Sequence, residues 1–253
     1  MRRFLLIALA SAFLPGFCHA QVGQPLVFPD RPGALTGTDI MPRYKLQLET
    51  GLGFESQTDG PSTFTLSNTQ LRFGLFEHTE IRVGADFLMV RQTPGAKPNY
   101  GLAPLDIELK TKFLNGSGFL PSIAFLAGLV SSHVGTKWLL PSHLSPEMHL
   151  LFENTVSDWM DICYNVGVLW DGETPTPTTF VGLGFEFDIT ERLGSFIESY
   201  NYLHPGATNQ YLTEFGFTWL LSPRVQLDLY ADLDFQQLGT FYNVSCGIAW
   251  LLN

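Results

Sequence analysis

The 253-residue chain has few charged residues and few cysteines. Charged side chains make up 15% of it, and 14 Lys and Arg stand against 24 Asp and Glu, for a net charge of −10. This shortage of cations argues against nucleic acid as a partner. Of the three cysteines, Cys163 and Cys246 lie in separate strand-like segments, so each is expected to be a buried or lipid-facing thiol without a disulfide.

Long apolar runs and catalytic motifs are also missing. After residue 20 no run of 18 apolar residues occurs, so no membrane-spanning helix is expected. The chain lacks G-x-S-x-G, H-E-x-x-H and C-x-x-C, so no catalytic residue, cofactor or metal ion is predicted. His133, His143 and His149 lie in or near one long connection beside several serines, which leaves a hydrolase Ser–His pair open. Their irregular spacing is less suited to a metal site.

Residues 1–20 resemble a secretory signal peptide. Arg2 and Arg3 precede an apolar stretch over 4–14, and Cys18-His19-Ala20 resembles a cleavage site before Gln21. A membrane anchor is the alternative, but the apolar stretch is short and Pro15 interrupts it. We therefore predict export through a cleaved signal peptide.

The remaining sequence is rich in period-two alternation, as in "RYKLQLETGLGFE" at 43–55. Apolar and polar side chains then fall on opposite faces of a strand, and 9–11 residues of a tilted strand cross a bilayer. Twelve segments are interpreted in this way, and 62–75 changes phase midway as a β-bulge would cause. The segments are 43–55, 62–75, 80–90, 105–113, 119–130, 147–156, 159–170, 179–189, 193–203, 210–219, 225–233 and 240–252.

The connections alternate between short and long, which is typical of outer-membrane barrels with short periplasmic turns and longer external loops. Asn115-Gly116, Ser157-Asp158 and Ser222-Pro223 supply turn residues in short connections. A soluble exported ligand-binding barrel would show the same alternation with its faces inverted. Glycines on the polar faces, aromatic residues near strand ends and the predicted signal peptide favour the membrane interpretation.

We therefore expect an all-β protein, an antiparallel transmembrane barrel of about twelve strands in the bacterial outer membrane. The predicted division is a signal peptide at 1–20, an N-terminal periplasmic or plug segment at 21–42, and the barrel at 43–253. The end of the chain, from Ser245 to Leu252, resembles the terminal strand read by barrel-assembly machinery, although it ends on Asn253 where many barrels end on an aromatic residue.

Several short motifs resemble the outer-membrane transporter family labelled as the meta-pathway of phenol degradation. They are Asp30-Arg31-Pro32-Gly33, Gly37-Thr38-Asp39, Leu46 to Gly51, Asn68 to Leu75, Glu80 to Gly84, Asp106 with Lys110 and Lys112, Phe196-Ile197-Glu198, and Gly247. Pro104-Leu105 departs from the Gly-rich start expected for the Asp106 strand. The resemblance implies a barrel that passes small aromatic or other hydrophobic solutes, with no enzyme activity.

The polar faces of the predicted strands supply a candidate lumen lining. Cross-strand ion pairs, such as Glu49 with Arg72 or Arg82 with Asp106, are the structural explanation, and charge selectivity is the functional one. Arg31 joins the lining if 21–42 folds into the barrel, where acidic residues would hold it. The candidates are Arg31, Lys45, Glu49, Arg72, Arg82, Asp86, Asp106, Glu108, Lys110, Glu186, Glu198, Glu214 and Asp228.

The favoured function is therefore a passive outer-membrane channel or uptake protein. Its expected partners are membrane lipid, a small solute and, during biogenesis, the barrel-assembly machinery. The long connection 131–146, with Trp138 and Leu139, could fold inward as a hydrophobic gate or remain exposed. A lipid-modifying hydrolase and a soluble exported ligand-binding protein remain the alternatives.

Overall fold

Long antiparallel strands build the protein, whose computed structural model describes residues 26–58, 60–234 and 241–253. The predicted signal peptide at 1–20 lies outside the described residues. The strands are β1 (Leu46–Gln57), β2 (Ser62–Phe76), β3 (Thr79–Arg91), β4 (Asn99–Leu102), β5 (Asp106–Leu114), β6 (Ser122–Val130), β7 (Ser145–Ser157), β8 (Met160–Leu169), β9 (Thr178–Asp188), β10 (Leu193–Leu203), β11 (Gln210–Ser222), β12 (Val225–Asp234) and β13 (Phe241–Leu251).

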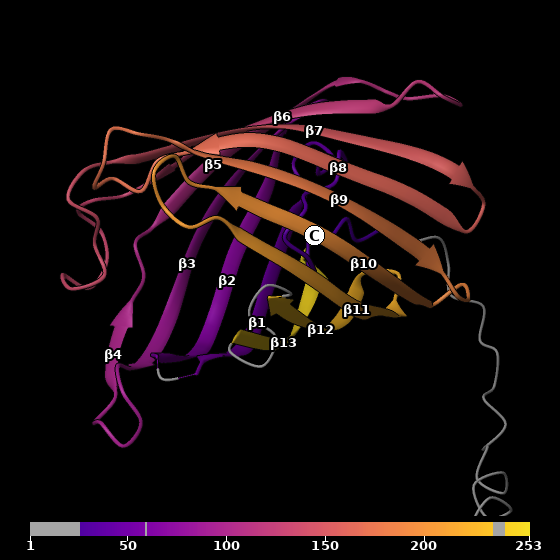
Figure 1. Ribbon diagram of the computed structural model, residues 1–253. Coiled ribbons are helices and arrows are strands. Elements are labelled where there is room, and N and C mark those ends of the chain that lie inside the picture. The colour runs from indigo at the N-terminus through magenta and orange to yellow at the C-terminus, as the bar shows by residue number, and fades with distance from the viewer. Residues whose placement is uncertain (1–25, 59, 235–240) are drawn as a thin grey trace, which may run out of the picture.

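The sheet closes on itself, because β1 pairs with both β2 and β13 while every other spanning strand pairs with its neighbours in sequence (Figure 1). Twelve strands form the wall, which confirms the predicted barrel. Closure gives each of these twelve strands a partner strand on both sides, which an apolar membrane requires. None of the described residues forms a helix long and apolar enough to cross a membrane.

One short strand, β4, lies outside this ring of twelve. It falls within residues 91–104, which the sequence interpretation left as a connection between two predicted strands, so that expectation is corrected. It pairs with the second half of β3, where Phe87 lies opposite Leu102 and Val90 opposite Asn99. The first half of β3 pairs instead with β5, from Thr79 to Gly84. Four residues give too short an alternation to be recognised in the sequence.

The barrel has two unlike ends. At the turn end, residues 77–78, 158–159 and 223–224 join strands by tight turns, and the C-terminus lies there beside the start of β1. Leu252 N donates to Leu46 O at 2.8 Å at this end. At the loop end, the longer connections include 131–144 and 170–177. The expected alternation of connection lengths is therefore observed.

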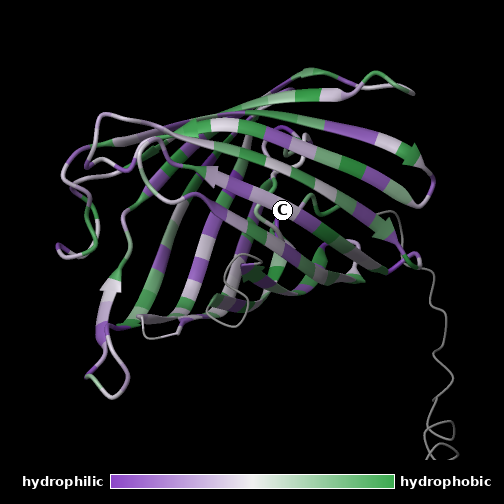
Figure 2. Ribbon diagram, in the orientation of Figure 1, coloured by the Kyte–Doolittle hydropathy of each residue, from purple (hydrophilic) through white to green (hydrophobic). Residues whose placement is uncertain are grey.

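The outward face of the wall is apolar. Hydropathy alternates residue by residue along the strands (Figure 2). Mid-strand side chains such as Leu183 and Ile197 are both 46% exposed. At the turn end, exposed aromatic residues encircle the wall, as in the interfacial belts of membrane barrels. This belt contains Tyr44, Phe76, Phe113, Trp159, Trp219 and Trp250.

Two strand boundaries differ from the sequence interpretation for local reasons. Tyr44 has a positive φ of 64°, so the first strand begins at Leu46 and not at residue 43. The phase change predicted within 62–75 is confirmed as a register shift between Thr65 and Ser67.

Candidate functional site

The N-terminal segment, residues 26–42, enters the barrel at the turn end and leaves at the same end. Leu26 N and Val27 N donate to Pro223 O at 2.7 and 3.1 Å, at the tight turn between β11 and β12. Tyr44 N donates to Gly74 O near the end of β2, which fixes the exit. Between these points the segment folds within the ring of strands (Figure 1). Its local structure lacks helix and strand, so its backbone donors must find partners on the wall.

Asp30 is the centre of the contacts on one side of the lumen. Its carboxylate lies 3.1 Å from Lys110 Nζ and 3.3 Å from Arg72 Nη2, and it also contacts Arg82 Nη2. These cations come from β2, β3 and β5 and are each at least 97% buried as side chains. Burial raises the pKa of the Asp30 carboxyl, but the three cations lower it by more, so its net pKa lies well below the ordinary value.

Three wall carboxylates complete the charge balance around these cations. Arg72 Nη1 donates to Glu49 Oε1 at 2.8 Å, and Arg72 Nη2 lies 3.0 Å from Glu80 Oε1. Arg82 Nε donates to the same Glu80 oxygen at 2.6 Å, while Arg82 Nη1 lies 3.4 Å from Glu108 Oε2. Because the cations are buried, each needs these counter-charges to offset its desolvation.

Arg31, the next residue, lies across the seam between β1 and β13, where the barrel closes. Its Nε and Nη2 donate to the two carboxylate oxygens of Asp228 at 3.2 and 3.1 Å, and its Nη1 donates to Asn68 Oδ1 at 2.7 Å. Burial lowers the pKa of this guanidinium, whereas the bond to Asp228 raises it by more, so its net pKa lies above the ordinary value. The backbone N of Arg31 donates to Glu49 Oε2 at 3.1 Å. Asp30 and Arg31, which are adjacent and oppositely charged, thus attach the segment to both sides of the seam between β1 and β13.

Two glycines make room for Arg31 at that seam. Gly51 of β1 lies directly opposite Gly247 of β13. A Cβ at either position would come within 2.7 Å of Arg31 Cζ, closer than side-chain carbons approach. Glycine is therefore needed here because the guanidinium lies flat against the backbone of the wall.

Residues 34–38 of the segment bind the wall formed by β7 to β10. Ala34 N and Leu35 N donate to Glu198 Oε2 at 3.0 and 3.1 Å, and Thr36 N donates to Asn165 Oδ1 at 2.8 Å. The Leu35 side chain is 4% exposed. It forms an apolar cluster with Cys163, Phe180, Tyr200 and Leu212.

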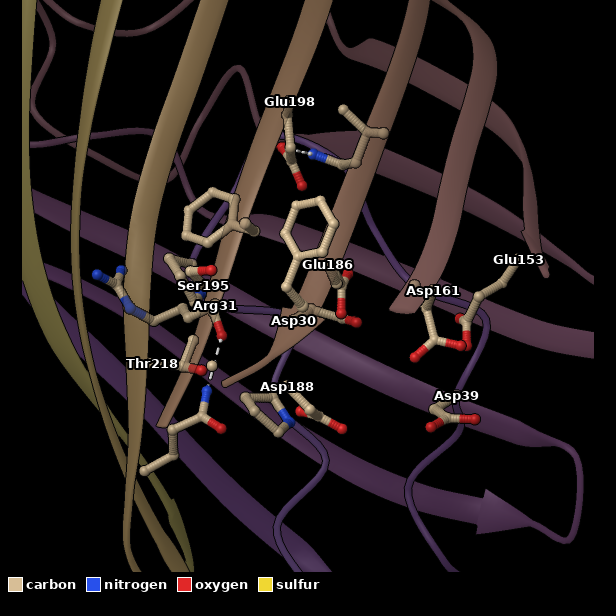
Figure 3. Close-up of a pocket in the computed structure, with 18 residues that line it drawn as sticks. Asp30, Arg31, Asp39, Glu153, Asp161, Glu186, Asp188, Ser195, Glu198 and Thr218 are labelled. Atoms are coloured by element: carbon tan, nitrogen blue, oxygen red, sulfur yellow. Dashed lines mark hydrogen bonds between the residues drawn. The ribbon is translucent and has the colours of Figure 1, made fainter. Parts of the chain in front are cut away.

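Two cavities adjoin the segment, and both are lined by Asp30, Arg31 and Pro32. Each has a volume of about 260 Å³. The first lies toward the turn end, where the carboxylates of Asp161, Glu186 and Asp188 face it (Figure 3). The second lies toward the loop end, and its lining includes Glu49, Arg82, Asp86, Asp106 and Glu108. Asp30 to Pro32 therefore form the boundary between the two cavities.

The structure places the predicted lining residues in different surroundings. Glu49, Arg72, Arg82, Glu108 and Lys110 share the Asp30 network. Asp86 accepts a bond from Asn68, Asp228 binds Arg31, and Glu198 binds the segment backbone. Asp106 and Glu186 line the cavities, and Glu214 is buried. Arg82 pairs with Glu108 rather than with Asp106, the partner suggested from the sequence.

Lys45 does not join this group. It is exposed and precedes β1, because the left-handed turn at Tyr44 delays the start of the strand. Asp30 and Glu80, by contrast, are central although neither was among the candidates. Asp30 could have been found as the acidic neighbour of Arg31. Glu80 could have been found from its place on the polar face of β3.

The three histidines are not gathered into a site. His133 Nδ1 and Ser132 Oγ are 2.8 Å apart but are neighbours in sequence on an exposed loop. His143 bonds to the backbone O of Gly172, and His149 lies 3.5 Å from Glu147 on β7. Within the described ranges, no group of three His, Cys, Asp or Glu residues is arranged to hold a metal ion.

Comparison with solved structures identifies the architecture. The outer membrane channel from Pseudomonas putida F1 aligns with a TM-score of 0.66 and 10% identity, over 87% of this chain and 99% of that chain. The chain has the fold of an outer-membrane porin. The KdgM porin aligns with a TM-score of 0.57 and 8% identity, over 81% and 99% of the two chains. The NanC porin gives 0.57 and 7%, over 80% and 98%.

No family model and no curated protein matches the chain. At identities of 7–10% the porin likeness supports the barrel fold but not a particular solute. The similarity to the phenol-degradation transporter family stays a prediction.

Proposed function

We propose that the protein is a passive outer-membrane channel for small solutes, with residues 26–42 as a plug within its lumen. The observation that carries the proposal is the position of Asp30 to Pro32 between two cavities inside a closed barrel. An apolar outer face with charged groups inside is the arrangement of a membrane barrel and the reverse of a soluble one. The tight turns would face the periplasm and the longer loops the exterior.

The ion pairs around Asp30 and Arg31 support a closed resting state. They join one short segment to β2, β3, β5 and β12. The two cavities leave space for water and small solutes on either side of this segment. A channel of this kind needs no catalytic residue, because selection depends on the pore lining and on the mobility of the plug.

The solute is proposed to be a small molecule that is aromatic or hydrophobic in part. Aromatic side chains that line a cavity near the loop end, Tyr200, Tyr202 and Phe241, support this class. Their rings could stack on a solute that enters from outside.

Liposome swelling tests the channel function. The full protein and a variant lacking residues 26–41 are reconstituted after heat-modifiable gel mobility has shown that both barrels are folded. We expect slow swelling with glycerol or arabinose for the full protein and faster swelling for the variant, because the deletion joins the two cavities. A folded variant that passes neither solute would overturn the proposal.

A further inference from the structure

The charges of the lumen are divided between two walls. One wall, strands β8 to β13, contains no Lys, Arg or His at any position, and we call it the acidic wall. It does contain eight acidic residues: Asp161, Glu186, Asp188, Glu198, Glu214, Asp228, Asp232 and Asp234. The buried wall cations Arg72, Arg82 and Lys110 come from β2, β3 and β5, where Asp30, Glu49, Glu80 and Glu108 neutralise them.

Strand register brings three carboxylates of the acidic wall and one of β1 into one line, which we call the carboxylate row. Glu198 of β10 lies directly opposite Glu214 of β11, and Glu214 lies directly opposite Asp232 of β12. Asp232 lies opposite Asn243 of β13, which in turn lies opposite Glu55 of β1. Like charges directly opposite each other destabilise a sheet, so this arrangement calls for a compensating partner.

The described residues supply no cation for the carboxylate row. None of its four members forms an ion pair there. Asp232 accepts bonds from Tyr200 Oη, at 2.9 Å, and from Asn243 Nδ2, both neutral donors. Glu214 is only 2% exposed, and its Oε1 is buried without any hydrogen-bond partner. Glu214 and Asp232 also share a side-chain hydrogen bond, so this pair of carboxyl groups holds a proton between them, and the buried Oε1 of Glu214 still lacks a donor.

A cavity of about 370 Å³ lies at the row, toward the loop end. Asp232 and Glu55 line it together with the aromatic rings of Tyr200, Tyr202 and Phe241. The rings of Tyr200 and Tyr202 meet edge to face, with centroids 6.0 Å apart. Carboxylates beside aromatic faces form the usual surroundings of an organic ammonium group, which combines ion pairing with cation–π attraction.

We infer that this cavity is a binding site for small organic ammonium ions, and that the channel passes such cations along its acidic wall. The second half of this inference rests on the proposed channel function, whereas the first half does not. Between the carboxylate row and the turn end, Glu186 and Asp161 lie directly opposite each other. Both face the first cavity described above, so the acidic lining continues toward the turn end (Figure 3). Intramembrane carboxylates without partners commonly mark the route of a cation.

Isothermal titration calorimetry of the full, folded protein with phenethylammonium and phenylacetate tests the site, since these probes share a ring and differ in charge. We expect phenethylammonium to bind and phenylacetate not to bind. Asp232→Asn and Glu55→Gln each remove a carboxylate from the cavity lining. Each should weaken binding by about fivefold or more, the effect of one unit charge at about 4 Å even in water. Asn243→Asp adds a carboxylate to the cavity lining and should strengthen the binding of phenethylammonium. Glu77→Gln, in an exposed turn, serves as the matched control.

Current through a planar bilayer under a potassium chloride gradient tests the route. We expect wild-type protein to prefer K⁺ over Cl⁻ and Asp232→Asn, in the cavity lining, to reduce that ratio. Wild-type protein that binds phenylacetate as well as phenethylammonium would overturn the site, whatever the variants do. Ammonium binding without any current would keep the site and refute the channel. Current without K⁺ preference or ammonium binding would keep the channel and refute this inference.

Discussion

Replacing Asp30 by Asn should release the N-terminal segment from the wall. The substitution keeps the size of the side chain and removes the charge that faces Arg72, Arg82 and Lys110. Removing one partner of a buried ion pair costs about 3–5 kcal/mol, because the remaining charge is left without compensation. Glu49, Glu80 and Glu108 still neutralise part of the cationic charge, so we expect the lower end of this range.

A native thiol provides the assay. Cys163 is 2% exposed and its Sγ lies 3.5 Å from Thr36 O, so the segment covers it. Cys246 is exposed and is replaced by Ala, so that Cys163 is the one cysteine left after residue 20. If a water-soluble maleimide reaches Cys163 only when the segment detaches, a loss of about 3 kcal/mol should speed labelling roughly a hundredfold.

Asp39→Asn is the matched control, because it makes the same chemical change in the same segment. Asp39 pairs with Lys112 at 3.2 Å, but its side chain is 61% exposed. Exposed pairs contribute about 0–1 kcal/mol, so labelling should rise fivefold at most. Heat-modifiable mobility must first show that both variants are folded. If Asp30→Asn then labels no faster than Asp39→Asn, the Asp30 network does not hold the segment.

Three further predictions concern the space around Arg31, the outward face of the wall and the charge of Asp30. Gly247→Ala should place a Cβ against the Arg31 guanidinium and raise Cys163 labelling while the heat-modifiable barrel persists; unchanged labelling would show that the wall yields instead. Leu183→Arg, on the outward face at mid-strand, should cost about 2–4 kcal/mol in urea unfolding from lipid vesicles and still fold, whereas a complete failure to fold would indicate a soluble core. Cations hold the pKa of Asp30 below its ordinary 3.8 despite burial, so its stabilising charge is present above that value and is lost only as pH falls through the lowered pKa. The difference in conductance between wild type and Asp30→Asn should therefore persist from pH 8 to pH 4, and its disappearance at pH 5 would contradict the assignment.

The sequence by itself determined the barrel. Period-two alternation places Leu48 and Glu49 on opposite faces wherever the strand lies, and the length of each segment limits what it can span. The alternation of connections then orders the strands as a meander with two unlike ends. Glu49 with Arg72 was also predictable as a contact, because neighbouring strands in a meander pair and both residues lie on polar faces.

Only the tertiary structure decided how the lumen is filled. Asp30 contacts β2, β3 and β5 at sequence separations that no local pattern encodes, and the turn at Tyr44 takes Lys45 away from the strand. The carboxylate row likewise depends on the register of five strands, including closure between β1 and β13. A shift of one residue in any pairing would turn a whole strand over, so the row exists only once every pairing is fixed.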